Sequence, residues 1–246
     1  MRTAPRILLL CVLGLGLLLA GCAGVRQPVE GEKVVDHRVD RGETLEEIAQ
    51  EYYGDRGRAG EIAKFNSVDA DEIRSGQTLR IPLTPQEQAE LSRRQAARGP
   101  YNEGLAQVEG GRYLDAVLSF QRAIEMDPAF AAAHYNLGVT FQRLESYDKA
   151  ADAYREAISQ DPRDANYKYA LGATRYHQGD YRDAIGWFKK ALDIDDHHRK
   201  AQYSLAKSYE KTSQTAKARA AWTRYLEIDG NSAWAQEARS RLELLE

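Results

Sequence analysis

Hydrophobic and polar positions repeat along the chain with a period of 34 residues between residues 97 and 232. Written in rows of that length, this segment aligns four times without a gap. Three positions keep their residue type in every row: alanine at Ala116, Ala150, Ala184 and Ala218, an aromatic at Phe120, Tyr154, Phe188 and Trp222, and tyrosine at Tyr101, Tyr135, Tyr169 and Tyr203. A row holds two stretches of helical apolar spacing, and a pair such as Asp161-Pro162 ends the second stretch. Each row therefore predicts a pair of helices.

Small residues in the rows predict how the two helices of a pair pack. One stands at the same position of every row, at Gly104, Gly138, Gly172 and Ala206. We expect it to let the two helices approach closely, with the aromatic side chain of the row filling the space beside it. After the last row, Trp234, Ala238 and Leu242 form one helical stripe, which predicts a capping helix within residues 233–246.

Residues 34–83 show a different pattern, which predicts the order strand, helix, helix, strand. Val34–Val39 is rich in β-branched residues, and a capping box at Thr44 and Glu47 predicts a helix that ends at Gly54. A second helix is expected over Arg58–Phe65, and a second strand, Thr78–Ile81, is expected to end at Pro82. Another capping box opens a helical linker over residues 84–96.

The N-terminus carries a short apolar run. Two arginines precede Ile7–Ala20, whose 14 residues are too few to cross about 30 Å of hydrocarbon at about 1.5 Å per residue, so residues 1–21 are predicted to be a signal peptide. The sequence Leu-Ala-Gly-Cys that ends at Cys22 resembles the lipobox of bacterial lipoproteins. This resemblance implies cleavage before Cys22, lipid on that cysteine and a tether over residues 22–33. In enteric bacteria, an Asp directly after the lipidated cysteine would favour retention in the inner membrane, but this chain has Ala23 there. We therefore expect the lipid to anchor the protein at the periplasmic face of the outer membrane.

Composition narrows the classes of function. With 34 Lys and Arg against 37 Asp and Glu, the net charge is −3, so no nucleic-acid partner is expected. The five His and two Cys predict no metal site and no cofactor, and His197 and His198 are interpreted as solvated turn residues. The sequence shows no nucleophile with a base at plausible spacing and no phosphate-binding glycine loop, so no catalytic residue is predicted.

The pattern of residues 34–83 resembles a LysM domain. The resemblance rests on a series of short motifs in the order of the family: His37–Val39, Gly42–Leu45, Ile48-Ala49, Tyr53–Asp55, Ile62, Asn66, Ile73 and the closing Gly76–Pro82. It implies that two loops bind glycan containing N-acetylglucosamine, which in a bacterial envelope means peptidoglycan. The glycan-binding residues that it implies here are Gly42, Glu43, Thr44, Leu45, Asn66, Ser67, Val68 and Ile73. Some of these residues are also turn and cap residues. Tyr52 and Tyr53 have two interpretations, either as rings that stack on sugar or as core residues.

The 34-residue rows resemble tetratricopeptide repeats. The resemblance implies four repeats, 97–130, 131–164, 165–198 and 199–232, in a curved solenoid whose inner groove is lined by the first helix of each pair. The groove residues expected to contact a protein or peptide partner are Tyr101, Tyr135, Tyr169, Tyr203, Arg143, His177 and Lys207. Rigid aromatics beside cations suit a peptide segment. The alternative, that the tyrosines only pack between neighbouring helices, stays open.

The sequence thus predicts a mainly α protein, in which a small βααβ LysM domain at residues 34–83 precedes an all-α solenoid at residues 97–246. The expected function is that of a non-catalytic envelope lipoprotein, which binds peptidoglycan, recruits an unidentified envelope protein and reaches the membrane through its lipid. Three alternatives are a self-associating tether between membrane and wall, a lipoprotein of pilus or secretion assembly, and a wall hydrolase. The last rests only on the frequent company of LysM domains and such enzymes.

Overall fold

The computed structural model of the protein describes residue 28 and residues 31–69 and 72–245. These residues divide between two compact units, with the division between Gln88 and Ala89. The first unit combines two strands with short helices, and the second is all helical. The prediction of a mainly α protein with a small sheet near its N-terminus is therefore confirmed.

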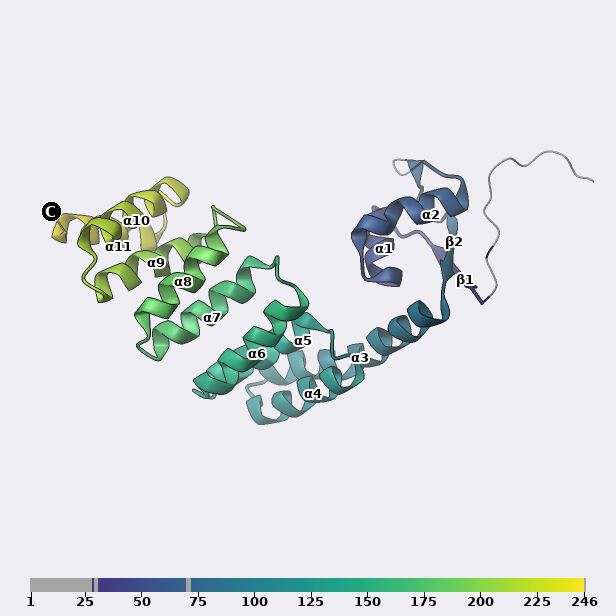
Figure 1. Ribbon diagram of the computed structural model, residues 1–246, viewed down its shortest axis with the longest axis horizontal. Helices are drawn as coiled ribbons and strands as arrows, with labels where there is room; N and C mark the ends of the chain where they lie inside the picture. Colours follow the sequence, from purple (N-terminus) through teal and green to yellow (C-terminus); the bar gives the residue numbers. More distant parts are fainter. Residues whose placement is uncertain (1–27, 29–30, 70–71, 246) are drawn as a thin grey trace, which may run out of the picture. The chain divides into compact units, whose positions relative to one another are not determined.

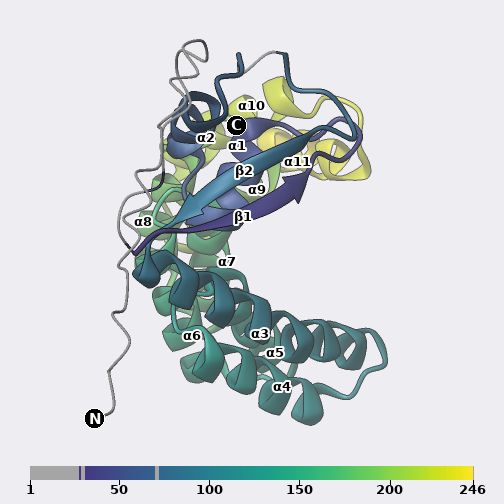
Figure 2. The same cartoon turned by 90° about the vertical axis from the view of Figure 1, so that its right-hand side faces the viewer.

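The first unit has the predicted order of elements. Strand β1 (Lys33–Arg38) is followed by helix α1 (Leu45–Tyr53), a 3-10 turn η1 (Arg56–Arg58), helix α2 (Ala59–Asn66) and strand β2 (Thr78–Leu83). The two strands pair antiparallel, from Lys33 opposite Leu83 to Arg38 opposite Thr78. Both helices cover the same face of this sheet (Figure 2).

Local signals fix the limits of α1. The Thr44 side chain accepts a hydrogen bond from the Glu47 N–H at 3.2 Å, and the Glu47 carboxylate accepts one from the Thr44 N–H at 2.9 Å. This capping box satisfies two backbone donors that a helix start leaves without partners. Gly54 ends the helix in the left-handed conformation, with φ of 74°, which glycine adopts without steric cost. The predicted start and end of α1 are both confirmed.

The core of the first unit lies between the sheet and the two helices. Its fully buried side chains include Ile48 from α1, Ile62 and Phe65 from α2, and Leu79 and Ile81 from β2. Tyr52 and Tyr53 are only 9% and 7% exposed, so the reading of these rings as core is the right one.

Pro82 does not end β2 as expected. The strand continues to Leu83, with Pro82 opposite Val34. Proline lacks an N–H, but in a two-stranded sheet each strand has a side that faces no partner strand, so the missing donor is tolerated there. The Pro82 carbonyl also accepts a hydrogen bond from the Tyr53 hydroxyl at 3.1 Å.

Helix α3 (Pro85–Glu109) joins the predicted linker to the first helix of the repeats without a break, so no helix end separates residues 84–96 from residue 97. Its start is capped as expected, because Thr84 and Glu87 exchange hydrogen bonds at 2.6 and 3.3 Å. Glu87 also pairs with Arg58 at 2.5 Å, and Arg58 lies 4.0 Å from the centroid of the Tyr53 ring. These contacts fasten the start of α3 to the first unit.

The second unit is a stack of antiparallel helix pairs (Figure 1). Its helices after α3 are α4 (Tyr113–Met126), α5 (Ala131–Arg143), α6 (Tyr147–Gln160), α7 (Ala165–His177), α8 (Tyr181–Leu192), α9 (Arg199–Lys211), α10 (Thr215–Ile228) and α11 (Ala233–Leu244). The pairs follow the 34-residue rows, and α11 occupies the place predicted for the capping helix.

Each helix pair closes on a contact between a small residue and an aromatic ring. A Cβ atom added to Gly104 would lie 2.6 Å from Phe120, one on Gly138 2.7 Å from Tyr154, and one on Gly172 2.8 Å from Phe188. The three rings are fully buried. In the fourth repeat Ala206 packs in the same cluster as Trp222. The prediction that small residues permit close helix packing is confirmed.

The turn inside each repeat uses a left-handed residue at one fixed row position. Gly111, Glu145, Gly179 and Ser213 have φ values of 72°, 55°, 81° and 56°. Two of the four are not glycine, although side chains with a Cβ adopt this conformation at a cost. The turn geometry is therefore imposed by the packing of the helix pair and not by glycine alone.

His198 is not the solvated turn residue that the sequence suggested. It is 9% exposed, and its Nδ1 accepts a hydrogen bond from the Ala201 N–H at 3.1 Å, which caps α9. Its ring also packs against Tyr169, with 5.2 Å between the ring centroids. Burial lowers the pKa of His198 below its ordinary value, which favours the neutral ring that can accept this bond. His197 is exposed, as expected.

We expect Gly138→Ala to destabilise the helix array. The new methyl group would enter the 2.7 Å space beside the buried Tyr154 ring, and overpacking of this kind costs about 1–3 kcal/mol of unfolding free energy. Denaturant unfolding followed by circular dichroism measures the change.

The matched control is Gly186→Ala in α8, where an added Cβ meets nothing within 4 Å. Alanine is the better helix former by about 0.5–1 kcal/mol, so this variant is expected to be at least as stable as the parent. Equal stability of the two alanine variants would contradict the account of the helix-pair contact.

Candidate functional site

The two loops implied by the LysM resemblance lie together at one end of the sheet. The first follows β1 and the second precedes β2, so the antiparallel pairing brings them to the same end. Main-chain hydrogen bonds join them: the Val39 N–H donates to the Gln77 carbonyl and the Gly76 N–H donates to the Val39 carbonyl, both at 2.8 Å. Backbone contacts thus help to position the two loops.

The first loop turns at Gly42 and is held by Glu43. Gly42 has φ of 82°, a conformation that favours glycine. The Glu43 carboxylate accepts a hydrogen bond from the Asp40 N–H at 2.8 Å and lies 2.9 Å from His37 Nε2. Burial alone would raise the pKa of Glu43, but these two contacts outweigh it and hold the pKa below its ordinary value. Glu43 is therefore a loop-positioning group.

His37 is a residue of this site to which the sequence assigned no role beyond its place in the LysM resemblance. It lies on β1, with its ring between Glu43 and Tyr52, whose hydroxyl is 3.2 Å from Nδ1. The His37 and Tyr52 rings meet edge to face at 5.5 Å between centroids. The only sequence signal was its position within the LysM-like motif, because the contact with Tyr52 spans 15 residues of chain.

One cluster in the described part of the chain has the donor set of a metal site. Ligand atoms of His37, Glu43 and Glu51 lie within 4.8 Å of one another. Two of these ligands already bond to each other, and the other ring nitrogen of His37 is within hydrogen-bond distance of Tyr52. A divalent cation could be held here only if the His37–Glu43 contact, which positions the first loop, were exchanged for metal ligation.

Asn66 has a structural role that the sequence did not reveal. Its side-chain amide donates to the Ile62 carbonyl at 2.9 Å and to the Arg80 carbonyl at 2.8 Å, and its oxygen accepts from the Arg80 N–H at 2.7 Å. These bonds tie the end of α2 to β2 and occupy the amide. The Asn66 side chain therefore supports the second loop, and the prediction that Asn66 belongs to the glycan-binding residues stays a prediction.

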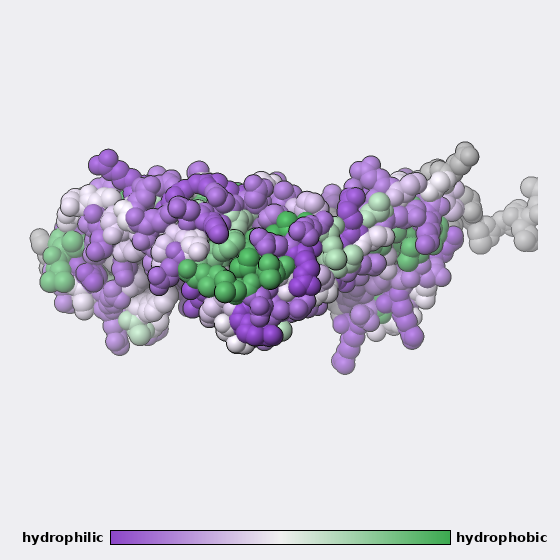
Figure 3. Space-filling model, turned by 90° about the horizontal axis from the view of Figure 1, so that it is seen from below, coloured by the Kyte–Doolittle hydropathy of each residue, from purple (hydrophilic) through white to green (hydrophobic). Residues whose placement is uncertain are grey.

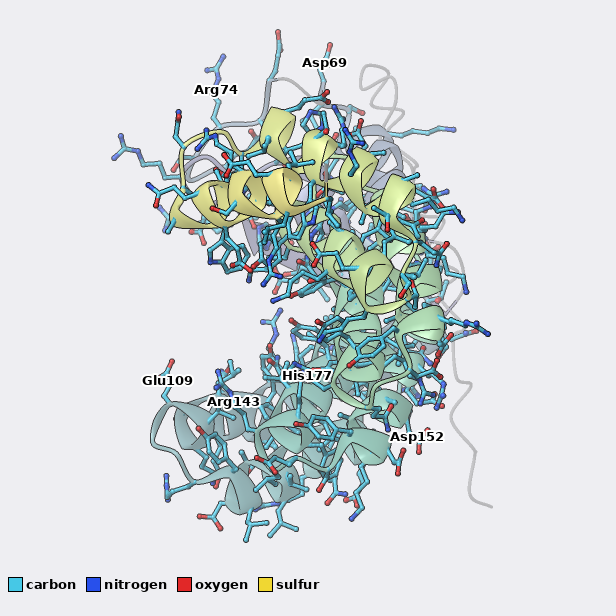
Figure 4. The ribbon with its side chains drawn as sticks, turned by 90° about the vertical axis from the view of Figure 1, so that its left-hand side faces the viewer. Asp69, Arg74, Glu109, Arg143, Asp152 and His177 are labelled. Atoms are coloured by element: carbon cyan, nitrogen blue, oxygen red, sulfur yellow. The ribbon has the colours of Figure 1, made fainter. Side chains whose placement is uncertain are left out.

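The other implied glycan residues differ in accessibility. The Leu45 side chain is fully buried in the core, so only its backbone remains for a ligand, and the Thr44 hydroxyl serves as the α1 cap. In the second loop Ser67 is exposed, whereas Val68 and Ile73 are half-buried. Asp69 and Arg74, which belong to the same loop, project from it into solvent (Figure 4).

The four groove tyrosines of the repeats are half-buried and pack between helices. Each ring contacts an aromatic ring on the next helix and a second ring at the start of the helix after that. The centroid distances are 5.9 and 4.7 Å from Tyr101 to Phe120 and Phe130, 5.6 and 5.0 Å from Tyr135 to Tyr154 and Tyr167, 5.9 and 5.2 Å from Tyr169 to Phe188 and His198, and 5.1 and 4.9 Å from Tyr203 to Trp222 and Trp234. Packing against neighbouring helices is thus one role of these residues.

The ends of the first helices of successive repeats lie on one side of the array. Figure 4 shows Glu109, Arg143 and His177, the last residues of α3, α5 and α7, on the open side, whereas Asp152 of α6 points to the opposite side. This side of the array therefore carries both a cationic and an anionic group.

A pocket of about 190 Å³ opens on this face between α7, α8 and α9. Its lining residues are Tyr169, Ala173, Tyr176, His177, Phe188, Tyr203, Ser204 and Lys207. Four of the seven predicted partner-binding residues meet here, namely Tyr169, His177, Tyr203 and Lys207. Tyr101, Tyr135 and Arg143 do not line this pocket.

The predicted lipidation site, Cys22, and the predicted signal peptide lie outside the described residues. Within the described part of the chain, every helix is too short or too polar to cross a lipid bilayer.

Comparison with protein families assigns both units. The LysM domain model matches residues 37–82. Two models of the tetratricopeptide repeat match the helical unit, one at residues 101–165 and 138–199 and the other at residues 175–242. Members of both families are binding modules. A comparison with curated proteins finds no significant match.

Solved structures that resemble the chain show the repeat fold. A crystal structure of MamA is 17% identical, with a TM-score of 0.51 over 58% of this chain and 91% of that chain. A double mutant of MamA from RS-1 is 16% identical, with a TM-score of 0.56 over 61% and 82%. PilF of Pseudomonas aeruginosa is 22% identical, with a TM-score of 0.54 over 63% and 73%. The chain thus joins a LysM domain to an array of tetratricopeptide repeats.

Proposed function

We propose that the protein is a non-catalytic adaptor of the bacterial cell envelope. Its LysM domain binds peptidoglycan, its repeats hold a protein partner, and lipid on Cys22 anchors it at the periplasmic face of the outer membrane. The observation that carries the proposal is the fixed juxtaposition of the two LysM loops through Val39, Gly76 and Gln77. Such a surface is built before the ligand arrives, so little loop-ordering entropy opposes glycan binding.

The order of the units supports an adaptor. The lipid attachment point of the proposal and the glycan-binding domain stand at the N-terminal end, and the repeats follow. Attachment of the chain to the membrane and to the wall raises the local concentration of its repeats there. Weak individual contacts then suffice to bring a protein partner to the wall.

A second candidate function is self-association of the array as a spacer between membrane and wall. Leu114 and Leu118 lie one turn apart on α4 and are 71% and 57% exposed. The view from below, onto the side where α4 lies in Figure 1, shows a hydrophobic patch on the repeat array (Figure 3). Exposed apolar surface of this kind is typical of a protein contact.

Peptidoglycan binding is tested by sedimentation of the chain from Ala23 onward, without lipid, with purified wall sacculi. We expect the protein to pellet with the sacculi, and oligomers of N-acetylglucosamine to return it to the supernatant, because both ligands would occupy the two LysM loops. Retention of the protein in the supernatant at all sacculus concentrations would contradict the proposal.

Glu43→Gln is expected to weaken sacculus binding about fivefold, because the first loop loses a charge-assisted hydrogen bond. Since the folded pKa of Glu43 lies below the ordinary 4.5, its ionised form stabilises the domain above that pH. This stabilisation is lost as the pH falls through the folded pKa, and the variant should lack that part of the pH dependence. Binding isotherms and thermal unfolding from pH 7 to pH 3 measure both effects.

The matched control is Glu46→Gln, which removes the same charge from an exposed position in the first turn of α1. We expect it to bind sacculi like the parent. If both variants bound equally well, the first loop would not be the glycan site.

Self-association is tested by light scattering of the same soluble chain. If the α4 surface joins two copies, the parent forms oligomers and the double variant Leu114→Lys, Leu118→Lys is a monomer, because charged side chains resist burial. A monomeric parent at all concentrations would eliminate this second candidate.

A further inference from the structure

The pocket between α7, α8 and α9, here called the α7–α9 pocket, exists because of two small side chains. Ala173 stands at the ninth position of its row, where the first two rows have Leu105 and Val139. Ser204 stands at the sixth position, where the second row has Asn136, whose amide donates to the Tyr101 hydroxyl at 2.9 Å. The space that larger groups fill between α3 and α5 is thus left open between α7 and α9.

The size and walls of the α7–α9 pocket suit one aromatic ring. Its volume of about 190 Å³ exceeds the ~150 Å³ of an apolar protein cavity that holds benzene. The rings of Tyr169, Tyr176, Phe188 and Tyr203 contribute to the lining. Aromatic rings pack favourably edge to face or offset against one another, so such walls select a ring over an aliphatic chain.

Tyr169 and Tyr203, two of the tyrosines that line the pocket, are held in place by contacts with neighbouring helices and helix ends. Tyr169 packs against Phe188 and His198, and the Tyr203 hydroxyl donates to the Glu237 carboxylate at 2.5 Å. A ring that enters therefore meets surfaces that are already ordered, and the entropy cost of binding is confined mainly to the ligand.

The charges beside the pocket favour an anionic ligand. Two carboxylates lie near it, but Glu210 accepts from Trp222 Nε1 at 2.5 Å and Glu237 from Tyr203, and both pair with Arg241 at 3.5 and 3.7 Å. Lys207 lies over the Tyr203 ring, with Nζ 5.4 Å from the centroid, and has no ion pair in the described part of the chain. A cation is therefore available at the pocket.

We infer that the α7–α9 pocket binds an aromatic side chain of the partner polypeptide, with a carboxylate next to that ring paired to Lys207. This inference rests on the proposed function, because it names the chemistry of the segment that the repeats hold. The carboxylate comes either from an adjacent Asp or Glu or from the C-terminus of a partner that ends in an aromatic residue.

The minimal probe of the pocket is 3-phenylpropionate, with 3-phenylpropanamide as its neutral match. Nuclear magnetic resonance titration of the soluble chain should show shifts confined to α7, α8 and α9, with tighter binding of the carboxylate probe. Ala173→Leu fills the pocket with a side chain that the first repeat carries at the same row position, and it should weaken both probes roughly 30-fold, as loss of a binding anchor does. Ala173→Ser keeps the volume and should bind like the parent.

The variant Lys207→Gln separates the contribution of the Lys207 charge to probe binding from the contribution of the pocket's shape. It should weaken the carboxylate probe about fivefold and leave the amide probe unchanged, because a half-exposed ion pair contributes modestly. Thermal unfolding of each variant shows whether the array is intact. Unchanged probe binding by a folded Ala173→Leu variant would overturn the inference, and equal binding of the two probes by the parent would overturn the role of Lys207.

Two pentapeptides distinguish the sources of the carboxylate. One has an internal Phe-Glu pair and an amidated C-terminus, and the other ends in Phe with a free carboxylate. The tighter binder identifies the source of the carboxylate, and failure of both peptides to bind would contradict the inference.

Crosslinked capture from envelope extract distinguishes failure of the pocket inference from failure of the proposed function. Equal capture of the same protein by the parent and Ala173→Leu would refute the pocket while leaving partner recruitment intact, whereas capture by neither would refute partner recruitment.

Discussion

The repeat array depends on the contact between a small residue and an aromatic ring in each helix pair. Gly138 against Tyr154 shows why: a Cβ at position 138 would lie 2.7 Å from the buried ring, so a side chain there would crowd the two helices. Because this contact fixes the pair, other row positions are free to differ between repeats. The exchange of Leu105 for Ala173 at one such position leaves the pair closed and opens a pocket on its inner face.

The LysM domain solves a different problem, because it must hold two loops without a large core. It does so with hydrogen bonds that link segments distant in sequence. Asn66 ties α2 to β2, the backbone of Val39 joins both loops, and Glu43 fastens the first loop to β1 through His37. A small number of polar contacts between segments distant in sequence therefore shapes the two loops.

Local and periodic signals let the sequence predict most of the fold. The Thr44 capping box, the Gly54 helix end and the 34-residue period each act within one element or between neighbours. The site was predicted less well, because the fate of a side chain depends on distant contacts. The Asn66 side chain forms hydrogen bonds with the backbone of Arg80, fourteen residues away, and His198 is buried against Tyr169. The packing of the four tyrosines against neighbouring helices and the α7–α9 pocket follow from helices meeting in three dimensions.

In the proposed function, one chain connects peptidoglycan to a protein partner. The most direct test loads purified sacculi with the soluble chain, adds envelope extract and identifies the proteins that sediment. We expect one extract protein to pellet only when the chain is present, and to be lost with Ala173→Leu although that variant itself still sediments. A chain that pellets while every extract protein sediments equally with and without it would contradict the connection.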